Sequence, residues 1–247
     1  MSANVVVRKC NGLGEYRACV ELQKQIWSEA DLEVVPETVF VVAEHTGGQI
    51  LGAFDGSRMV GFTLALPGIH NRGAYLHSHM TAVVTEHRDR GIGRMLKVFQ
   101  RDEALSRDIR LIEWTFDPLE MRNAHFNLNR LGAIARRYLP NLYGITSSPL
   151  HRGLATDRLV AEWYLDSPRV LAALNGELPN PDVADAIEIP SSLEDWKASD
   201  LAQVQTLQAR IRDEFTELFA KGYAAMGVAK TARGSEYQLA SWSDFRI

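Results

Sequence analysis

The sequence lacks the features that mark secreted, metal-binding and membrane-spanning proteins. Its 247 residues include only two cysteines, Cys10 and Cys19, with no Cys-x-x-Cys pair and no Cys/His cluster, so neither a disulfide framework nor a zinc site is expected. The apolar N-terminal stretch is too short for a signal peptide. No run approaches the roughly 20 apolar residues that a membrane helix needs. A cytoplasmic protein without a metal ion or a membrane partner is therefore expected.

Positive charge is also scarce. Lysine and arginine number 27 against 31 aspartates and glutamates, which gives a formal net charge of −4. Affinity for phosphate backbones needs a basic surface, so no nucleic-acid partner is expected, and a cationic substrate is weakly favoured. Hydrophobic residues make up 46% of the chain, enough to bury a sizeable core. The length fits one large domain, or a domain of about 150 residues with an appendage.

The hydrophobic pattern predicts helices first, then a meander of strands, then strands alternating with helices. This order is typical of an α/β domain with a mixed sheet. The expected strands are 5–7, 49–54, 59–66, 75–84, 111–116 and 159–165, and the expected helices are 15–28, 36–47, 91–106 and 122–138.

A breaker-rich segment, 175–182, predicts a linker between a main domain, 1–175, and a C-terminal α+β extension, 183–247. The extension reads as one helix with an apolar stripe, followed by a hairpin. So small a unit has limited stability alone. We expect it to pack on the main domain or on a partner subunit, so a homodimer is possible.

The most informative segment is the apolar strand that runs into an Arg-x-x-Gly-x-Gly turn and then into an amphipathic helix, residues 81–96. Gly91 and Gly93 allow a close approach to the backbone, and the new helix offers unpaired N–H donors. Arg88, Arg90 and Arg94 add positive charge. The pattern suits a pyrophosphate group. A plain strand–turn–helix connection is the alternative.

The spacing Val83-x-x-x-x-Arg88-x-x-Gly91-x-Gly93 resembles motif A of the GCN5-related N-acetyltransferase (GNAT) superfamily. The segment 121–133 is similar to that superfamily's motif B, which it matches at Ala124, Leu131 and Gly132. The segments 114–124 and 156–163 resemble one uncharacterised predicted-acetyltransferase group that also carries a C-terminal extension. The resemblance implies the GNAT acyl-CoA N-acyltransferase fold, a mixed sheet flanked by helices, from about residue 5 to 165.

The resemblance also implies an enzyme that moves an acetyl or other acyl group from acyl-CoA to an amine of a small molecule by direct transfer. Acetyl-CoA is then a co-substrate, held along one strand and at the turn that follows it. The residues carried over for this binding are Thr81, Ala82, Val83, Arg88, Asp89, Arg90, Gly91, Ile92, Gly93, Arg94 and Asn123.

The candidate catalytic bases are His77 and His79, which lie two apart on a predicted strand and so share a face. In the superfamily, a tyrosine often protonates the leaving thiolate, but Leu128 occupies that position here. Tyr143 or Tyr138 could replace it, or the thiolate could leave unaided. A catalytically silent acyl-CoA-binding or regulatory module is the alternative.

Two further polar features have two interpretations each, and one loop has a candidate role. Asp117 reads as the cap of the helix that begins near residue 122, or as a ligand for a cation. Arg136 and Arg137 read as a basic helix end, or as contacts to a CoA phosphate. The loop 68–73 could line the acceptor site.

Overall fold

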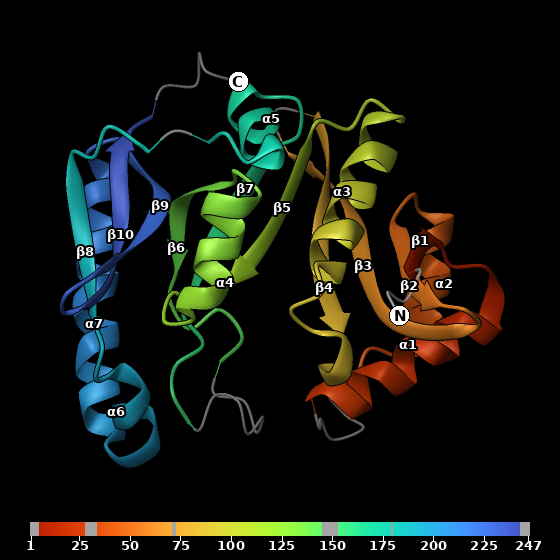
Figure 1. The fold of residues 1–247 in the computed structure, drawn as a ribbon, viewed down its shortest axis with the longest axis horizontal. Helices are drawn as coiled ribbons and strands as arrows, with labels where there is room; N and C mark the ends of the chain where they lie inside the picture. Colours follow the sequence, from red (N-terminus) through yellow and green to blue (C-terminus); the bar gives the residue numbers. More distant parts are fainter. Residues whose placement is uncertain (1–4, 28–33, 71–72, 145–152, 179, 243–247) are drawn as a thin grey trace. The chain divides into compact units, whose positions relative to one another are not determined.

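The computed structural model describes residues 5–27, 34–70, 73–144, 153–178 and 180–242. The chain divides into two compact units, Met1–Glu113 and Trp114–Ile247 (Figure 1). The division lies inside the strand β5 (Leu111–Phe116).

The first unit is a sheet with helices on both faces. Its strands lie in the order β1-β2-β3-β4-β5, antiparallel except for β4 and β5, which are parallel. The other elements are β1 (Val5–Lys9), α1 (Gly12–Trp27), α2 (Glu37–His45), β2 (Gln49–Asp55), β3 (Arg58–His70), β4 (Gly73–Val83), η1 (Thr85–His87) and α3 (Ile92–Leu105).

Alternation along β3 shows which helix covers which face. The Phe62 ring packs against Phe40 of α2 and Trp27 of α1, with ring centroids 6.1 and 6.5 Å apart. The preceding residue, Gly61, points the other way, where an added Cβ would lie 3.4 Å from Leu96 of α3. Successive side chains of a strand point to opposite faces, so α1 and α2 cover one face and α3 the other.

A register shift interrupts the pairing of β3 with β4. Leu64 lies opposite Met80 and Ala65 lies opposite Ser78, which leaves His79 as an extra residue, a β-bulge. On its other edge, β4 pairs with β5 only through residues 76–77, so the strand leaves that neighbour after His77. Both irregularities lie in the stretch that the sequence assigns to the site.

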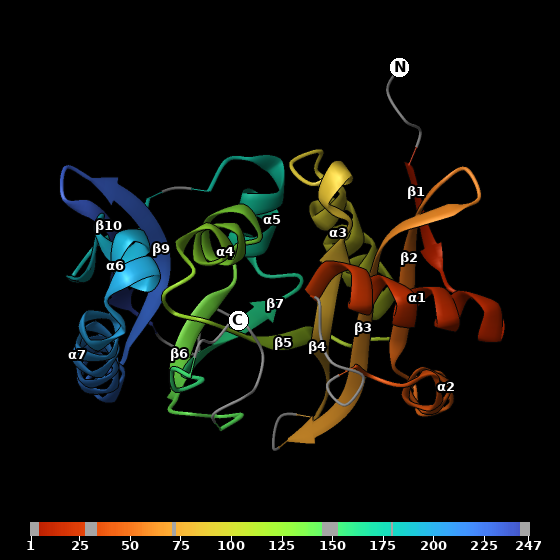
Figure 2. The ribbon, with the colours of Figure 1, turned by 90° about the horizontal axis from the view of Figure 1, so that it is seen from below.

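The second unit is an antiparallel sheet of strands in the order β7-β6-β9-β10-β8. Figure 2 shows α4 and α5 on the same side of β6 and β7. The elements are α4 (Met121–His125), a π-helical turn η2 (Phe126–Arg130), β6 (Ile134–Leu139), β7 (Arg158–Tyr164), α5 (Pro168–Asn175), β8 (Asp185–Pro190), α6 (Leu193–Ser199), α7 (Leu201–Ala220), β9 (Tyr223–Thr231) and β10 (Gly234–Ser241).

The helix expected over 122–138 is wrong in its second half. The helical segment ends at Arg130, and residues 134–139 form β6, which pairs with β7. The helix ends just before Gly132, which adopts a left-handed φ of 75°. Glycine is required at this position because an added Cβ would lie 2.9 Å from Ala173 Cβ. Strand pairing therefore overrides the helical propensity of the segment.

The C-terminal extension is larger than the expected helix and hairpin, because β8 and α6 join them. It lies in the same compact unit as residues 114–175. Phe215 of α7 contacts Tyr138 of β6 and Tyr237 of β10, with ring centroids 5.7 and 5.1 Å apart. Val228 N–H donates to Asn129 Oδ1 at 2.9 Å. Helix α7 thus belongs to the core of this unit.

Both cysteine thiols are free and buried in the first unit. Cys19 Sγ lies 3.7 Å from Met59 Sδ. A hydrogen bond with Cys10 and burial both raise the pKa of the Cys19 thiol, which keeps it protonated and unreactive. Of the helices that the structure describes, none has the length and apolar character to cross a membrane.

Candidate active site

The turn before α3 presents a row of unpaired backbone donors. Helix α3 begins at Ile92, after Gly91 with a φ of 79°. The N–H groups of residues 90–93 donate to no described residue, and the first bond back runs from Met95 N–H to Gly91 O, at 3.0 Å. A Cβ added at Gly91 or Gly93 would meet no atom within 4 Å. Free donors at the positive end of a helix, in open space, are suited to bind an anion, so this turn is a candidate anion site.

Arginines surround this anion site. Arg88 and Arg90 are exposed, and Arg94 is half-buried in the first turn of α3. Arg88 Nε donates to Val83 O at 3.2 Å, so this side chain folds back on the end of β4. Asp89 adopts a φ of 59°, a left-handed conformation that aspartate tolerates better than most residues. The turn therefore combines neutral backbone donors with a net positive charge.

The strand that leads into the turn is paired on one edge only. Residues 81–83 pair with residues 61–63 of β3, whereas the pairing with β5 ends at His77. Among the described residues of this unit, the edge of β4 beyond His77 has no partner strand. An open edge of this kind can pair with the amide groups of an extended ligand.

His77 and His79 lie side by side on β4, with ring centroids 6.3 Å apart. Burial and the neighbouring His79 lower the pKa of His77, against the opposing effect of Glu113, which lies opposite it on β5. Desolvation also lowers the pKa of His79. Both rings are therefore neutral near pH 7 and can accept a proton. Among the described residues, no three His, Cys, Asp or Glu side chains form a metal-binding group.

A buried polar cluster lies behind the bulge, and the sequence analysis missed it. Lys97 of α3 donates to Ser78 Oγ at 2.7 Å and to Gln100 Oε1 at 3.0 Å. Its side chain is almost fully buried, and burial lowers its pKa to about 7. Helical periodicity could have indicated the burial of Lys97, because Lys97, Gln100 and Ala104 lie on the same buried face of α3.

The motif-B residues lie in the second unit. Asn123 is exposed on α4, whereas Asn127 is buried and its Nδ2 has no hydrogen-bond partner. Leu128, at the position where a tyrosine is frequent, is fully buried. The Leu128 side chain therefore fills a core position and cannot supply a proton.

The two candidate acids differ in their surroundings. Tyr138 donates to Asp157 Oδ2 at 2.7 Å, and burial and this carboxylate raise the pKa of the tyrosine. Tyr143 is half-exposed, and its hydroxyl lies 3.0 Å from Thr115 Oγ1. Tyr138 is thus held by Asp157, whereas the Tyr143 hydroxyl is more accessible.

Three expectations about polar residues are corrected. Asp117 accepts from Leu119 N–H at 2.7 Å and closes a turn, while Glu120 precedes α4 as its N-cap residue. Arg136 and Arg137 lie on a strand rather than at a helix end, and both pair with Glu162, at 2.6 and 3.3 Å. Residues 68–70 belong to β3 rather than to a loop, and residues 71–72 lie outside the described part of the chain.

Comparison of the chain with solved structures identifies its fold. The chain matches the ribosomal-protein-S18-alanine N-acetyltransferase of Escherichia coli, with 12% identity over 65% of this chain and 94% of that one, and a TM-score of 0.52. It matches an acetyltransferase of the GNAT family from Streptococcus pneumoniae, with 12% identity over 64% and 98% and a TM-score of 0.52. Arabidopsis thaliana NAA60 in complex with acetyl-CoA matches with 12% identity over 65% and 99% and a TM-score of 0.53.

No protein-family model and no curated protein sequence matches the chain. The matched structures are covered almost completely, and about a third of this chain lies outside each match. The chain therefore has the fold of the GNAT acetyltransferases.

Proposed function

We propose that the protein transfers an acyl group, most simply acetyl, from acyl-CoA to an amine of a small molecule. The observation that carries the proposal is the continuity of the unpaired β4 edge with the free N–H groups of residues 90–93. An extended amide chain that ends in a pyrophosphate matches both features. CoA has this form, and the acyl thioester supplies an activated carbonyl group.

Residues of the first unit would hold this co-substrate. The backbone of Thr81, Ala82 and Val83 would pair with the pantetheine amides, and the turn from Arg88 to Arg94 would hold the pyrophosphate. Asn123 stays a sequence-based proposal for a further contact to the co-substrate. The open space at Gly91 and Gly93 leaves room for phosphate oxygens.

His77 is proposed as the base, with His79 beside it. The neutral imidazole takes a proton from the attacking amine while the new C–N bond forms and the C–S bond breaks. An unpaired N–H of β4 steadies the developing oxyanion. A thiol of pKa near ~8.5 can leave unaided, so the transfer needs no separate acid.

The first test is a thermal-shift titration with acetyl-CoA, free CoA and NAD. A ligand that binds only the folded state raises the free energy of unfolding by about 2.7 kcal/mol at one hundred times its dissociation constant. We expect both CoA species to stabilise the protein and NAD to have no effect. A panel of amines with thiol release as the readout then tests transfer. CoA binding without thiol release would favour the silent module.

A further inference from the structure

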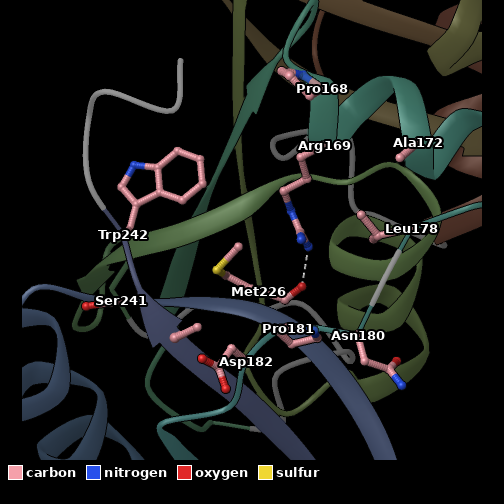
Figure 3. A pocket seen from close by; sticks show the side chains of 11 residues that line it. Pro168, Arg169, Ala172, Leu178, Asn180, Pro181, Asp182, Met226, Ser241 and Trp242 are labelled. Atoms are coloured by element: carbon pink, nitrogen blue, oxygen red, sulfur yellow. Dashed lines mark hydrogen bonds between the residues drawn. The ribbon is translucent and has the colours of Figure 1, made fainter.

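A cavity lies in the second unit, and none of the residues assigned to acyl-CoA lines it. Its volume is ≈ 620 Å³, within the usual range of small-molecule sites. It lies between α5, Leu178, residues 180–182 and the strands β9 and β10 (Figure 3). The apolar walls come mainly from Ala172, Leu178, Pro181, Met226, Ala240 and Trp242.

Arg169 enters this cavity from the first turn of α5 and is the one cationic side chain among its described lining residues. Its Nε donates to Gly132 O at 3.1 Å, and its Nη2 donates to Leu128 O at 3.1 Å. Its Nη2 also donates to Met226 O, the bond that Figure 3 shows. All three acceptors are neutral carbonyls. Among the described residues, no carboxylate pairs with this guanidinium, and its Nη1 has no hydrogen-bond partner.

Arg169 is half-buried, and a guanidinium partly removed from water without a paired carboxylate is unusual. Burial lowers the pKa of Arg169 to about 10, yet the group stays charged near pH 7. Buried charges in proteins are normally paired. An anion placed at Nη1 would supply the missing partner through charge-assisted hydrogen bonds.

The remaining walls limit the kind of anion. Asp182 is exposed and lines the same cavity, so a ligand with a second negative charge is disfavoured. Trp242 stacks on Tyr164 with ring centroids 6.2 Å apart, which fixes the indole as a flat wall. Met226 adds an adaptable apolar surface between Arg169 and Trp242 (Figure 3).

We propose that this cavity is a binding site for a monocarboxylate with an aromatic or branched apolar body. The carboxylate binds Arg169 Nη1, and the body packs against Met226, Leu178 and Trp242. The site uses none of the residues assigned to acyl-CoA, so it stands independently of the proposed transferase activity.

Calorimetric titration of the full chain tests the site, with phenylacetate as the probe and phenylacetamide and inorganic phosphate as comparisons. Saturable binding of phenylacetate is expected, with at least about tenfold weaker binding of the neutral amide, or about 1.4 kcal/mol. Phosphate should bind more weakly than phenylacetate. Absence of saturation by about 10 mM phenylacetate, or equal affinity for the amide, would overturn the proposal.

Ala172→Phe locates the site. Ala172 is half-buried on α5 and lines the cavity, so a phenyl ring there fills the space without removing any bond of Arg169. Leu171→Phe is the matched control, because Leu171 is 46% exposed on the same helix and does not line the cavity. Ala172→Phe should weaken phenylacetate binding at least about tenfold, and Leu171→Phe should not. Equal affinities in the two variants would contradict the assignment.

A surface variant keeps the test valid if Ala172→Phe does not fold. Asp182→Asn removes an exposed charge at the cavity and should strengthen phenylacetate binding severalfold, less so at high salt. An unchanged affinity in this variant would count against the site. Saturating acetyl-CoA should not displace phenylacetate, and displacement would place the carboxylate at the other site instead.

Discussion

The buried ammonium group of Lys97 donates a 2.7 Å hydrogen bond to Ser78 Oγ, and Ser78 lies between His77 and His79 on β4. This bond fixes α3 to the strand at the point where the β-bulge begins. Helix α3 also begins with the phosphate turn. One buried polar contact thus joins the element proposed to bind the pyrophosphate to the strand proposed to carry the base.

Lys97→Met should remove a pH dependence of stability. The pKa of Lys97 is lowered to about 7 in the folded state from 10.5, so between these values the unfolded chain binds more protons. The free energy of unfolding should therefore rise with pH in that window, by at most about 1.4 kcal/mol per pH unit from this group. Denaturant titrations from about pH 7 to 10 should show a smaller slope in Lys97→Met. Lys230→Met, at an exposed position, should keep the wild-type slope.

His77→Ala should lower kcat about 10²- to 10⁴-fold and leave the affinity for acetyl-CoA nearly unchanged. Because the pKa of His77 lies below its usual value, the wild-type rate should hold level through neutral pH and fall only on the acid side of about 6.5. His45→Ala, at an exposed residue of α2, is the control. A wild-type rate in His77→Ala across about pH 6 to 9 would remove this residue from the mechanism.

Gly93→Ala should weaken CoA binding about tenfold without destabilising the fold. A Cβ at this position meets no protein atom within 4 Å, so any loss of affinity comes from the ligand side. Gly14→Ala in the first turn of α1 is a matched control, since its Cβ also enters open space. Titration calorimetry measures the affinity for CoA, and thermal melting measures the stability of each variant. Equal CoA affinity in the two variants would discredit the pyrophosphate assignment.

Phe215→Ala should destabilise the second unit by about 3–5 kcal/mol, because the ring is fully buried between Tyr138 and Tyr237. Leu201→Ala, at a residue 37% exposed on the same helix, should cost far less. Urea titration measures both. A small effect of Phe215→Ala would mean that α7 is not part of the core that β6 and β10 share.

The sequence predicted those parts of the fold in which local pattern and tertiary contacts agree. The strand–turn–helix around Gly91 is such a case, because alternation, glycine and helical periodicity all indicate the same structure. Residues 134–139 are the opposite case. Their local propensity is helical, and only pairing with residues distant in sequence makes them a strand.

The site shows the same limit. The sequence predicted that His77 and His79 share one face of a strand. It did not predict the β-bulge at His79, because the bulge depends on the register between β4 and β3. The helical periodicity places Lys97 on one face of α3. Its burial against Ser78 could not be predicted, because it depends on how α3 packs on the sheet. The surroundings of Arg169 could not be predicted, because the carbonyl groups that its Nε and Nη2 contact come from residues 128–132 and from Met226, which are distant in sequence from Arg169 and from each other.

The burial of both native thiols makes the chain a convenient background for labelling. Cys10 and Cys19 lie inside the first unit, and the raised pKa of Cys19 suppresses its thiolate. A maleimide or nitroxide reagent should therefore modify a newly introduced surface cysteine in preference to either. Paired labels, one at exposed Met95 on α3 and one at exposed Leu171 on α5, would report the separation of the two units by spectroscopy as acetyl-CoA is added.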